Sequence, residues 1–389
     1  MPIVNRIADL HADITAWRRD IHAHPELQYD VHRTAGTVAD KLKTFGCDEV
    51  VTGIGRTGVV GVIRGNKAGE GGRVIGLRAD MDALPIEEAT DVPYKSTVLG
   101  RMHACGHDGH TAMLLGAARH LAETRNFAGT AIVIFQPAEE GGAGGKAMVQ
   151  DGLMERFKIE EVYGMHNYPG LAVGQFALRA GPFMAAADRI IIDIEDSGGR
   201  AARPHASIDP ILVGSQIINQ IQSIVARNVD PLDAAVVSIT VFKAGSTDNV
   251  IPQEAQLRGT ARSLTPKVRD LLETRLREVV TGTAQLYGAT ANFTYRRGYP
   301  ATRNHERQAA FAASVAREVA GRDRVDDQVA PAMIAEDFSY MLEARPGAFI
   351  FVGNGATAGL HHPAYDFNDE VIPYGTSYWV KLVETALAS

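Results

Sequence analysis

Residues 130–142 read Thr-Ala-Ile-Val-Ile-Phe-Gln-Pro-Ala-Glu-Glu-Gly-Gly. The apolar run predicts a buried strand over 130–135, and the strand delivers Glu139 and Glu140 at its carboxyl end, where ligand sites of α/β sheets lie. Two adjacent carboxylates repel each other unless a cation or a proton separates them. We expect one carboxylate to bind a metal ion and the other to take a proton from metal-bound water. A solvated acidic loop is the alternative interpretation.

Strands and helices alternate on both sides of this stretch, which predicts an α/β layer structure. Before it, helices are expected over 6–22, 34–45 and 107–122, with strands over 58–63 and 73–79. After residue 300 the alternation resumes with a helix ending at 320, a strand over 348–352 and a helix from 373.

Residues 188–295 follow a different order that predicts a separate domain. The segments read as strand 189–194, helix 209–227, strands 235–242 and 254–262, helix 266–287 and strand 290–295. This β-α-β-β-α-β order is the split βαβ, or ferredoxin-like, arrangement. We therefore expect a discontinuous larger domain over 1–186 and 300–389, interrupted by an inserted α+β domain over 187–299.

Composition narrows the function classes. The chain has 389 residues, 39 Lys+Arg against 46 Asp+Glu, a net charge of −7 and no basic block, which argues against a nucleic-acid partner. No apolar run reaches the roughly 18 residues that a membrane helix needs, and the N-terminus is charged where a signal peptide is apolar. Only two cysteines occur, which fits a reducing compartment. We expect a cytoplasmic protein whose partner is a small molecule or a peptide.

Histidine and cysteine cluster at predicted strand ends. Residues 102–111 read MHACGHDGHT, so a thiol at Cys105 and an imidazole at His107 stand two residues apart at a loop-to-helix junction. A polar helix start capped by Asp108 is the alternative. A further strand ends at His166, and His361 with His362 follows the strand over 349–352. One such residue is ordinary, whereas four strand-end clusters together indicate a metal site.

Two other motifs need separate interpretation. Residues 78–85 read RADMDALP, and their carboxylates are expected to orient a ligating imidazole or to cap the following turn. Residues 53–58 satisfy GxGxxG but lead into a predicted strand instead of a helix, so they are not a dinucleotide-binding fingerprint. The chain has neither a GxSxG elbow nor a GxxxxGK[ST] loop.

Taken together, the chain resembles the zinc-peptidase-like amidohydrolases, which include hippurate hydrolase, N-acyl-amino-acid aminohydrolases and plant indole-acetyl-amino-acid hydrolases. The resemblance covers nearly the whole chain and is carried by RADMDALP (78–85), MHACGHDGHTAMLLGAA (102–118), FQPAEEGG (135–142), GMHN (164–167), DNVIP (248–252), AEDFSY (335–340) and LHHPAYDFND (360–369). It implies a zinc-peptidase-type catalytic domain whose mixed sheet is flanked by helices, with an inserted lid domain that mediates homodimerisation.

The resemblance also implies roles for individual residues. Glu139 corresponds to the general base and Asp82 to an acid that supports the metal site; His362 is the second choice to its neighbour His361. One or two divalent ions are implied, with Zn favoured and Mn, Co or Ni tolerated by the same ligands. The implied ligands are Cys105, His107, Glu140, His166 and His361.

One position departs from the family pattern. Residues 196–205 read DSGGRAARPH, so Arg200 stands where the resemblance leads us to expect a histidine that stabilises the tetrahedral intermediate. Arginine can still donate hydrogen bonds, but it is longer and permanently charged. Asn249 and Arg262 are candidates to bind a substrate carboxylate, with a turn asparagine and a solvated arginine as the alternatives.

We therefore expect metal-dependent hydrolysis of N-acyl amino acids to a carboxylic acid and a free amino acid, with Glu139 as general base. A dipeptidase or carboxypeptidase of the same chemistry is the nearest alternative. A catalytically impaired homologue that binds an acyl-amino acid is the other, and Arg200 is the residue that argues for it. The expected partners are a small N-acyl amino acid and a second copy of the chain, without nucleic acid or membrane.

Overall fold

The computed structural model describes residues 4–67 and 72–388, which fold into two compact units. The first unit comprises Met1–Gly181, Arg303–Ala330 and Asp337–Ser389, and the second comprises Pro182–Thr302 and Pro331–Glu336. The predicted domain ends at residues 1 and 389 lie outside the described residues. The second unit includes the short segment 331–336, which the sequence analysis assigned to the catalytic domain.

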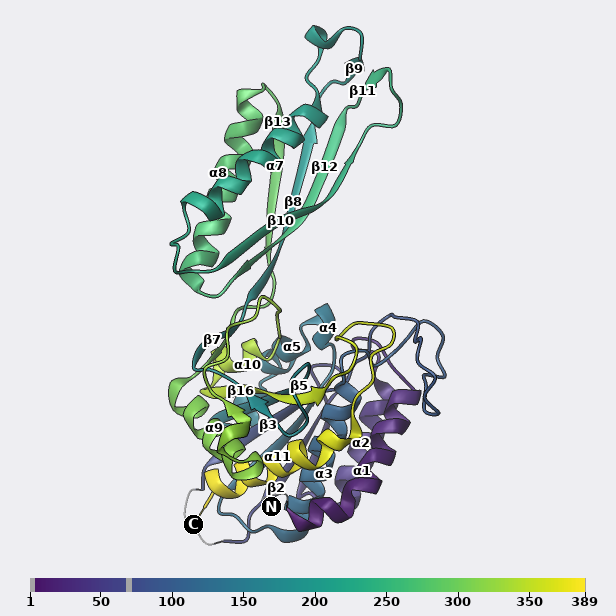
Figure 1. The fold of residues 1–389 in the computed structure, drawn as a ribbon, viewed down its shortest axis with the longest axis vertical. Coiled ribbons are helices and arrows are strands. Elements are labelled where there is room, and N and C mark those ends of the chain that lie inside the picture. Colours follow the sequence, from purple (N-terminus) through teal and green to yellow (C-terminus); the bar gives the residue numbers. More distant parts are fainter. Residues whose placement is uncertain (1–3, 68–71, 389) are drawn as a thin grey trace. The chain divides into compact units, whose positions relative to one another are not determined.

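The first unit is built on a mixed eight-stranded sheet in the order β1-β2-β4-β3-β5-β16-β6-β15 (Figure 1). Strands β4, β3, β5 and β16 run parallel to one another, whereas β2 is antiparallel to β4 and β6 is antiparallel to β16. The strands are β1 (Glu49–Ile54), β2 (Gly58–Arg64), β3 (Val74–Asp80), β4 (Thr130–Gln136), β5 (Glu161–Pro169), β6 (Phe176–Ala177), β15 (Val325–Asp326) and β16 (Gly347–Gly355).

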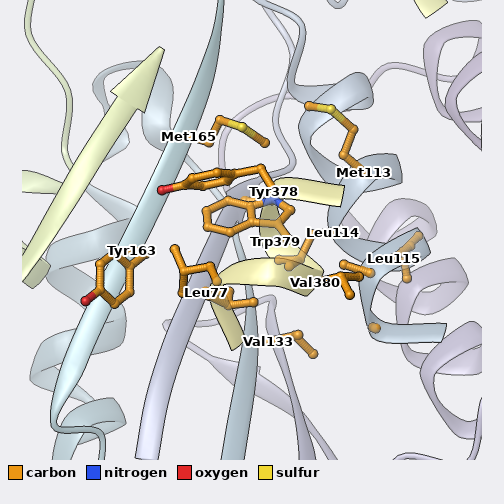
Figure 2. Packing of buried hydrophobic residues seen from close by; sticks show 14 of the residues in the cluster. Leu77, Met113, Leu114, Leu115, Val133, Tyr163, Met165, Tyr378, Trp379 and Val380 are labelled. Carbon is orange, nitrogen blue, oxygen red and sulfur yellow. The ribbon is translucent and has the colours of Figure 1, made fainter. Parts of the chain in front are cut away.

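Helices flank this sheet, as predicted for the α/β class (Figure 1). They are α1 (Asn5–Ala23), α2 (His32–Thr44), α3 (His107–Thr124), α4 (Glu139–Gly142), α5 (Gly144–Gln150), α6 (Leu153–Arg156), α9 (Glu306–Ala320), η2 (Arg322–Arg324), α10 (Ser339–Ala344), η3 (Asp369–Val371) and α11 (Ile372–Ala386). Helix α3 packs against α1, α11 and β3. Leu77, Leu114 and Trp379 are buried together in the resulting core (Figure 2). Helix α3 is buried on nearly all sides, so its position is fixed by packing.

The second unit has the predicted β-α-β-β-α-β order. Its antiparallel sheet runs β10-β12-β8-β13 and is covered by α7 and α8, with a core that includes Ile192, Ile217 and Leu272. The elements are β8 (Ala186–Glu195), β9 (Gly199–Arg200), η1 (Pro204–Ala206), α7 (Pro210–Arg227), β10 (Ala235–Ala244), β11 (Val250–Ile251), β12 (Glu254–Ser263), α8 (Pro266–Leu286) and β13 (Thr290–Arg297). Strands β9 and β11 form a small sheet, and β7 (Gly181–Met184) pairs with β14 (Thr302–Asn304).

Two details refine the sequence interpretation. Strand β1 was not predicted, because its alternation of exposed and half-buried residues gives a weak apolar signal. It forms a hairpin with β2, and Gly53 and Gly55 have positive φ angles of 86° and 59° at its turn, so the GxGxxG stretch is a hairpin turn as expected. Among the described residues, no helix is long and apolar enough to cross a membrane.

Candidate metal centre

Neighbouring strands of the first unit bring the predicted site residues to one edge of the sheet. Asp80 is the last residue of β3, Glu139 and Glu140 follow β4, and His166 lies near the end of β5. The carboxyl ends of parallel strands meet at one edge, so motifs far apart in the sequence converge here. His361 comes in the loop that follows β16, the strand next to β5.

The thiol of Cys105 lies just before helix α3, and the imidazole of His107 lies on the first residue of that helix. Cys105 and His107 flank Gly106, which has a left-handed φ of 86° and precedes the helix. A Cβ atom at position 106 would overlap the amide of Asn167 and the hydroxyl of Tyr365. Glycine is therefore required there, because both the backbone angle and the close approach exclude a side chain. Gly106, rather than Asp108, occupies the position before the helix.

The ligand-type atoms of these residues lie close together. Sγ of Cys105 is 3.3 Å from Nε2 of His166, and Nε2 of His361 is 3.1 Å from Oε1 of Glu140. Among the described residues, five groups have all their ligand atoms within 4.8 Å of one another, and three of them consist of predicted site residues: Cys105 with His107 and His166, Cys105 with Glu140 and His361, and His107 with Glu139 and Glu140. Cys105, His107 and Glu140 each belong to two of these three groups, so the groups overlap.

The donor set fits a divalent cation. Both ring nitrogens of His107 are fully buried and have no hydrogen-bond partner among the described residues; the nearest carboxylate oxygens, of Asp82 and Asp80, are 3.4 and 3.6 Å away. Burial lowers the pKa of His107, but Asp80, Asp82 and Glu140 outweigh it and raise that pKa to about 10. The carboxylates around His107 therefore favour positive charge at this position, either on the imidazole or as a metal ion.

The electrostatics of the thiol lead to the same conclusion. Burial raises the pKa of Cys105 well above its ordinary value, and the charges of Glu140 and Glu139 raise it further. The thiolate is therefore unfavourable unless positive charge stands beside it. His166 is prepared for such an ion, because its Nδ1 lies 2.6 Å from the carbonyl oxygen of Asn167 and donates to it, which leaves the Nε2 lone pair facing the sulfur.

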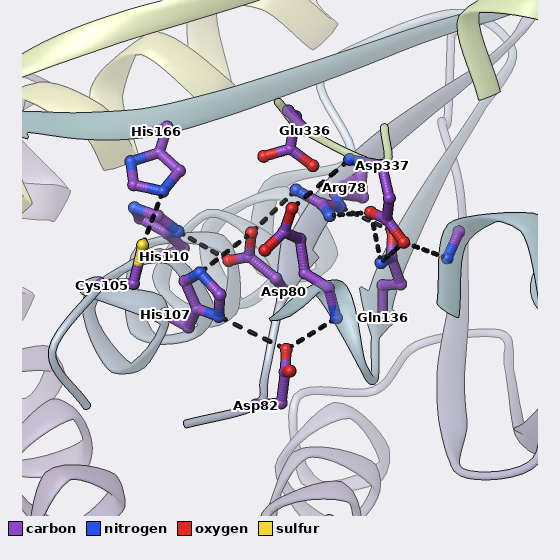
Figure 3. A network of polar contacts seen from close by, with 12 residues as sticks. Arg78, Asp80, Asp82, Cys105, His107, His110, Gln136, His166, Glu336 and Asp337 are labelled. Atoms are coloured by element: carbon purple, nitrogen blue, oxygen red, sulfur yellow. Dashed lines mark hydrogen bonds and ion pairs between the residues drawn. The ribbon is translucent and has the colours of Figure 1, made fainter. Parts of the chain in front are cut away.

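Asp82 holds the turn that carries the carboxylate pair. Its two oxygens accept hydrogen bonds from the backbone N–H groups of Glu139 (2.9 Å) and Glu140 (3.1 Å), and Oδ1 faces Nδ1 of His107 (Figure 3). One buried carboxylate thus orients both halves of the predicted ligand set. Figure 3 also shows that Cys105 and His166 point toward each other from different elements.

A segment that the sequence analysis did not single out supports the same turn. The backbone carbonyl of Gln28 accepts from Ala138 (3.1 Å), its side-chain amide donates to the carbonyl of Glu140, and the hydroxyl of Tyr29 donates to the carbonyl of Gly142 (2.8 Å). Gln28 and Ala138 both have left-handed φ angles, of 53° and 54°. Such backbone is costly outside glycine and concentrates at functional sites. No sequence signal linked this loop to a turn more than a hundred residues away.

The two adjacent histidines, His361 and His362, make different contacts. His361 has a left-handed φ of 63°, and its side chain, 53% exposed, contacts Glu140. His362 instead accepts a hydrogen bond on Nδ1 from the backbone N–H of Ala364 (3.0 Å) within its own turn. Of the pair, only His361 belongs to a ligand group among the described residues.

The second unit carries the three predicted substrate-binding residues. Arg200 ends β9, where it pairs with Val250 of β11, and the carbonyl of Asn249 accepts from the backbone N–H of Ala201 (3.1 Å), so Arg200 and Asn249 lie close together, both exposed. Arg262 is half-buried and lies near the end of β12. At a rise of about 3.3 Å per residue, it lies about 25 Å from the first residue of that strand. The unit therefore does not bring Arg262 near the other two.

Comparison with known proteins places this geometry in a family. The model of "Peptidase family M20/M25/M40" matches residues 76–385. A hippurate hydrolase of Campylobacter jejuni is 42% identical over 98% of both chains, and an N-acetylcysteine deacetylase of Bacillus subtilis is 39% identical over 97% of both. The crystal structure of a dinuclear metal-binding M20 peptidase from Bacillus subtilis covers 98% of this chain and 99% of its own, with 34% identity and a TM-score of 0.85. The chain thus belongs to the peptidase family M20/M25/M40.

Proposed function

We propose that this protein is a metal-dependent hydrolase that cleaves the amide bond of N-acyl or N-aroyl amino acids to a carboxylic acid and a free amino acid. The observation that carries the proposal is the shared position of Cys105 in two ligand groups, with Glu139 beside them. The similarity to a hippurate hydrolase and to an N-acetylcysteine deacetylase supports this class of substrate. Cys105, His107, Glu140, His166 and His361 are the residues that would hold one or two divalent ions.

When bound, a divalent cation supplies Lewis acidity toward a water molecule and toward the carbonyl oxygen of the amide. Glu139 is the general base in this proposal. Its carboxylate is 7% exposed and its backbone is held by Asp82, so it can take a proton from the attacking water and return it to the leaving amine. Asp82 acts through Glu139, Glu140 and His107 and does not itself react.

The metal is proposed to be Zn²⁺, because a thiolate with imidazoles and one carboxylate is a typical zinc set, although Mn²⁺, Co²⁺ and Ni²⁺ accept the same ligands. The decisive experiment is a hydrolysis panel of N-acetyl, N-benzoyl and indole-acetyl amino acids. It uses metal-stripped protein and the same protein reconstituted with each of the four ions. Release of the free amino acid only after reconstitution supports the proposal, and no release with any ion contradicts it.

A peptidase activity of the same chemistry is the second candidate, favoured by the description of the family that the chain matches. The same panel decides between the two when it includes free dipeptides and N-blocked dipeptides. Faster cleavage of peptides with a free amino group than of N-acyl amino acids favours the peptidase.

A catalytically impaired binding protein is the third candidate, and Arg200 is the observation that favours it. In the active candidate, Arg200 and Asn249 contribute hydrogen-bond donors to the substrate, and Arg262 binds a carboxylate. If ligand binding is detected by calorimetry while every hydrolysis assay is negative, the binding protein is favoured.

We further propose that the second unit acts as a lid and mediates a homodimer or higher homo-oligomer in the cytoplasm. Within the part of the chain that the structure describes, strand β10 pairs on one side only, with β12, and Phe242 on this strand is 39% exposed. Ile211 and Leu212 of α7 are 42% and 47% exposed. An unpaired strand edge next to exposed apolar side chains is a common interface. Light scattering on the purified protein measures the oligomeric state.

A further inference from the structure

Arg78 is buried beneath the candidate metal centre and joins two carboxylates from separate segments. It is 1% exposed, its Nη1 lies 2.8 Å from Oδ2 of Asp80, and its Nη2 lies 2.9 Å from Oδ1 of Asp337 (Figure 3). Its Nε donates to the side-chain oxygen of Gln136 (2.8 Å). A buried guanidinium with this many partners is held in one geometry, because it presents its donors in a rigid plane.

The first carboxylate leads toward the histidines. Oδ1 of Asp80 lies 2.6 Å from Nδ1 of His110, and Nε2 of His110 accepts the backbone N–H of Asn167 (3.0 Å). A backbone N–H can only donate, so Nε2 is unprotonated and the proton sits on Nδ1, where it is donated to Asp80. Both nitrogens of His110 are therefore used, and His110 is not a metal ligand even though it lies within ligand distance of Asp80 and His107.

This arm ends at the candidate ligands. Asn167 is the residue next to His166, and its side-chain amide donates to the backbone carbonyl of Cys105 (2.7 Å). The chain of contacts from Arg78 through Asp80 and His110 therefore reaches the backbone of the thiol and of one ligating imidazole.

The second carboxylate leads to the turn that carries Glu139. Asp337 accepts hydrogen bonds from the side-chain amide of Gln136 (2.8 and 2.9 Å), just before the turn, and from the backbone N–H of Gly145 (2.7 Å), just after it. Its own backbone N–H faces Oε1 of Glu139 at 3.4 Å. Asp337 thus anchors both ends of the turn from a segment about two hundred residues away in the sequence.

We propose that Arg78 is a positioning residue that couples the two halves of the centre: through Asp80 it holds the histidine and thiol side, and through Asp337 it holds the turn that carries Glu139. This inference rests on the proposed function only where kcat is measured, and the measurements of metal affinity do not depend on it. Outer partners of metal ligands orient those ligands, and their loss typically weakens metal binding or activity by about 10- to 100-fold.

The first test is Arg78→Lys, measured as metal affinity by competition with a chromogenic chelator. Lysine keeps the charge but is a point donor that cannot bridge both carboxylates in one plane. We expect the apparent Zn²⁺ dissociation constant to rise by about 10-fold or more. The matched control is Arg73→Lys, just before the opposite end of β3, where Arg73 pairs with Glu161 (2.8 Å); its dissociation constant is expected to equal that of the wild type.

The second test separates the two arms. Asp80→Asn is expected to weaken metal binding, as the loss of a residue that orients metal ligands typically does. Asp337→Asn is expected to leave the Zn²⁺ dissociation constant within about threefold of the wild type and to lower kcat. A merely structural effect would weaken metal binding and kcat together, so the split between these two variants is the informative readout.

These measurements also remain decisive if one variant fails. Circular dichroism and thermal unfolding check that each variant folds. If Arg78→Lys does not fold, the proposal is decided by whether Asp80→Asn weakens metal binding while Asp337→Asn lowers kcat. Wild-type metal affinity in both Arg78→Lys and Asp80→Asn overturns it, and so does equal weakening by Asp80→Asn and Asp337→Asn. Chelator competition needs no substrate, so wild-type protein that binds Zn²⁺ but hydrolyses nothing refutes the proposed function alone.

Discussion

The thiol of Cys105 and the imidazole of His166 face each other at 3.3 Å, with the lone pair of Nε2 directed at the sulfur. One residue precedes helix α3 and the other lies on β5, so the contact exists only because strand ends and a helix start meet at one sheet edge. The site has ligand atoms and excess negative charge, which a bound cation would neutralise.

Replacing the thiol should remove metal binding. We expect Cys105→Ser to raise the Zn²⁺ dissociation constant by more than about 100-fold, because a neutral hydroxyl replaces a thiolate that belongs to two ligand groups. This increase is larger than the one expected when a residue that only orients the ligands is lost. Metal content after dialysis against a chelator measures the loss. The control is Cys47→Ser, since Cys47 is half-buried against the core; metal retention equal to the wild type in Cys105→Ser contradicts the assignment.

Removing the base should separate catalysis from metal binding. Glu139→Gln keeps the shape of the side chain but cannot accept the proton of water, so kcat is expected to fall by about 10²- to 10⁴-fold while the metal content stays near that of the wild type. Glu343→Gln, on the exposed side of α10, is the matched control. Glu139 is not the base if kcat changes by less than tenfold.

Restoring histidine in the second unit should improve turnover. Arg200→His is expected to raise kcat/KM by about tenfold or more, because loss of one donor to the developing oxyanion typically costs about 10²- to 10³-fold. Steady-state kinetics on the best substrate of the panel measure the change. Arg203→His, in the same exposed loop, controls for the loss of charge. An unchanged or lower kcat/KM for Arg200→His would reject a defect at this position.

Stability should depend on pH through a buried histidine of α1. Burial lowers the pKa of His22, but hydrogen bonds to Asp108 (2.8 Å) and Glu88 (3.2 Å) raise it to about 9, above the 6.5 of the unfolded chain. The charged imidazole therefore stabilises the fold fully below pH 6.5, and this contribution is lost as pH rises through about 9.

Urea unfolding at pH 6 and pH 9 tests this expectation. The destabilisation caused by His22→Gln should be larger at pH 6 than at pH 9 by about 1–3 kcal/mol. His32→Gln, whose imidazole is 74% exposed, should show no such difference. Equal destabilisation by His22→Gln at both pH values would mean that the imidazole is not charged in the fold.

The segment under the carboxylate turn should contribute modestly to both stability and metal binding. Tyr29→Phe removes the hydrogen bond to the carbonyl of Gly142 and keeps the ring, which stacks against the guanidinium of Arg56 at 4.1 Å. We expect the free energy of unfolding to fall by about 1 kcal/mol and the Zn²⁺ dissociation constant to rise several-fold. Tyr374→Phe is the control, because Tyr374 is half-buried on α11, away from the turn. Identical metal affinity in both variants argues against a role for the Tyr29 hydroxyl in the turn.

Much of the architecture could be predicted from local sequence. The β-α-β-β-α-β order of the second unit follows from apolar periodicity, and the positions of β4 and α3 follow from long buried runs next to glycine. The weakly patterned strand β1 was missed, because a half-exposed strand carries little apolar signal. The candidate ligands were found because each lies near the end of a strand, after a strand, or at the start of a buried helix.

The supporting contacts could not be predicted in this way. Asp337 and Arg78 are 259 positions apart, and their ion pair depends on the burial of two charges in one place. The choice between His361 and His362 depends on a left-handed backbone angle that turns one ring toward Glu140.

The sequence by itself determined the fold class, the strand-end positions of thiol, imidazoles and carboxylates, and the departure at position 200, because these follow from periodicity and residue chemistry along the chain. Only the tertiary structure decided that His110 is bonded through both nitrogens, that Asp82 holds the Glu139 turn, and that Arg78 bridges two carboxylates. The physical reason is that buried polar groups must find partners wherever the packed core places them, whatever their separation in sequence.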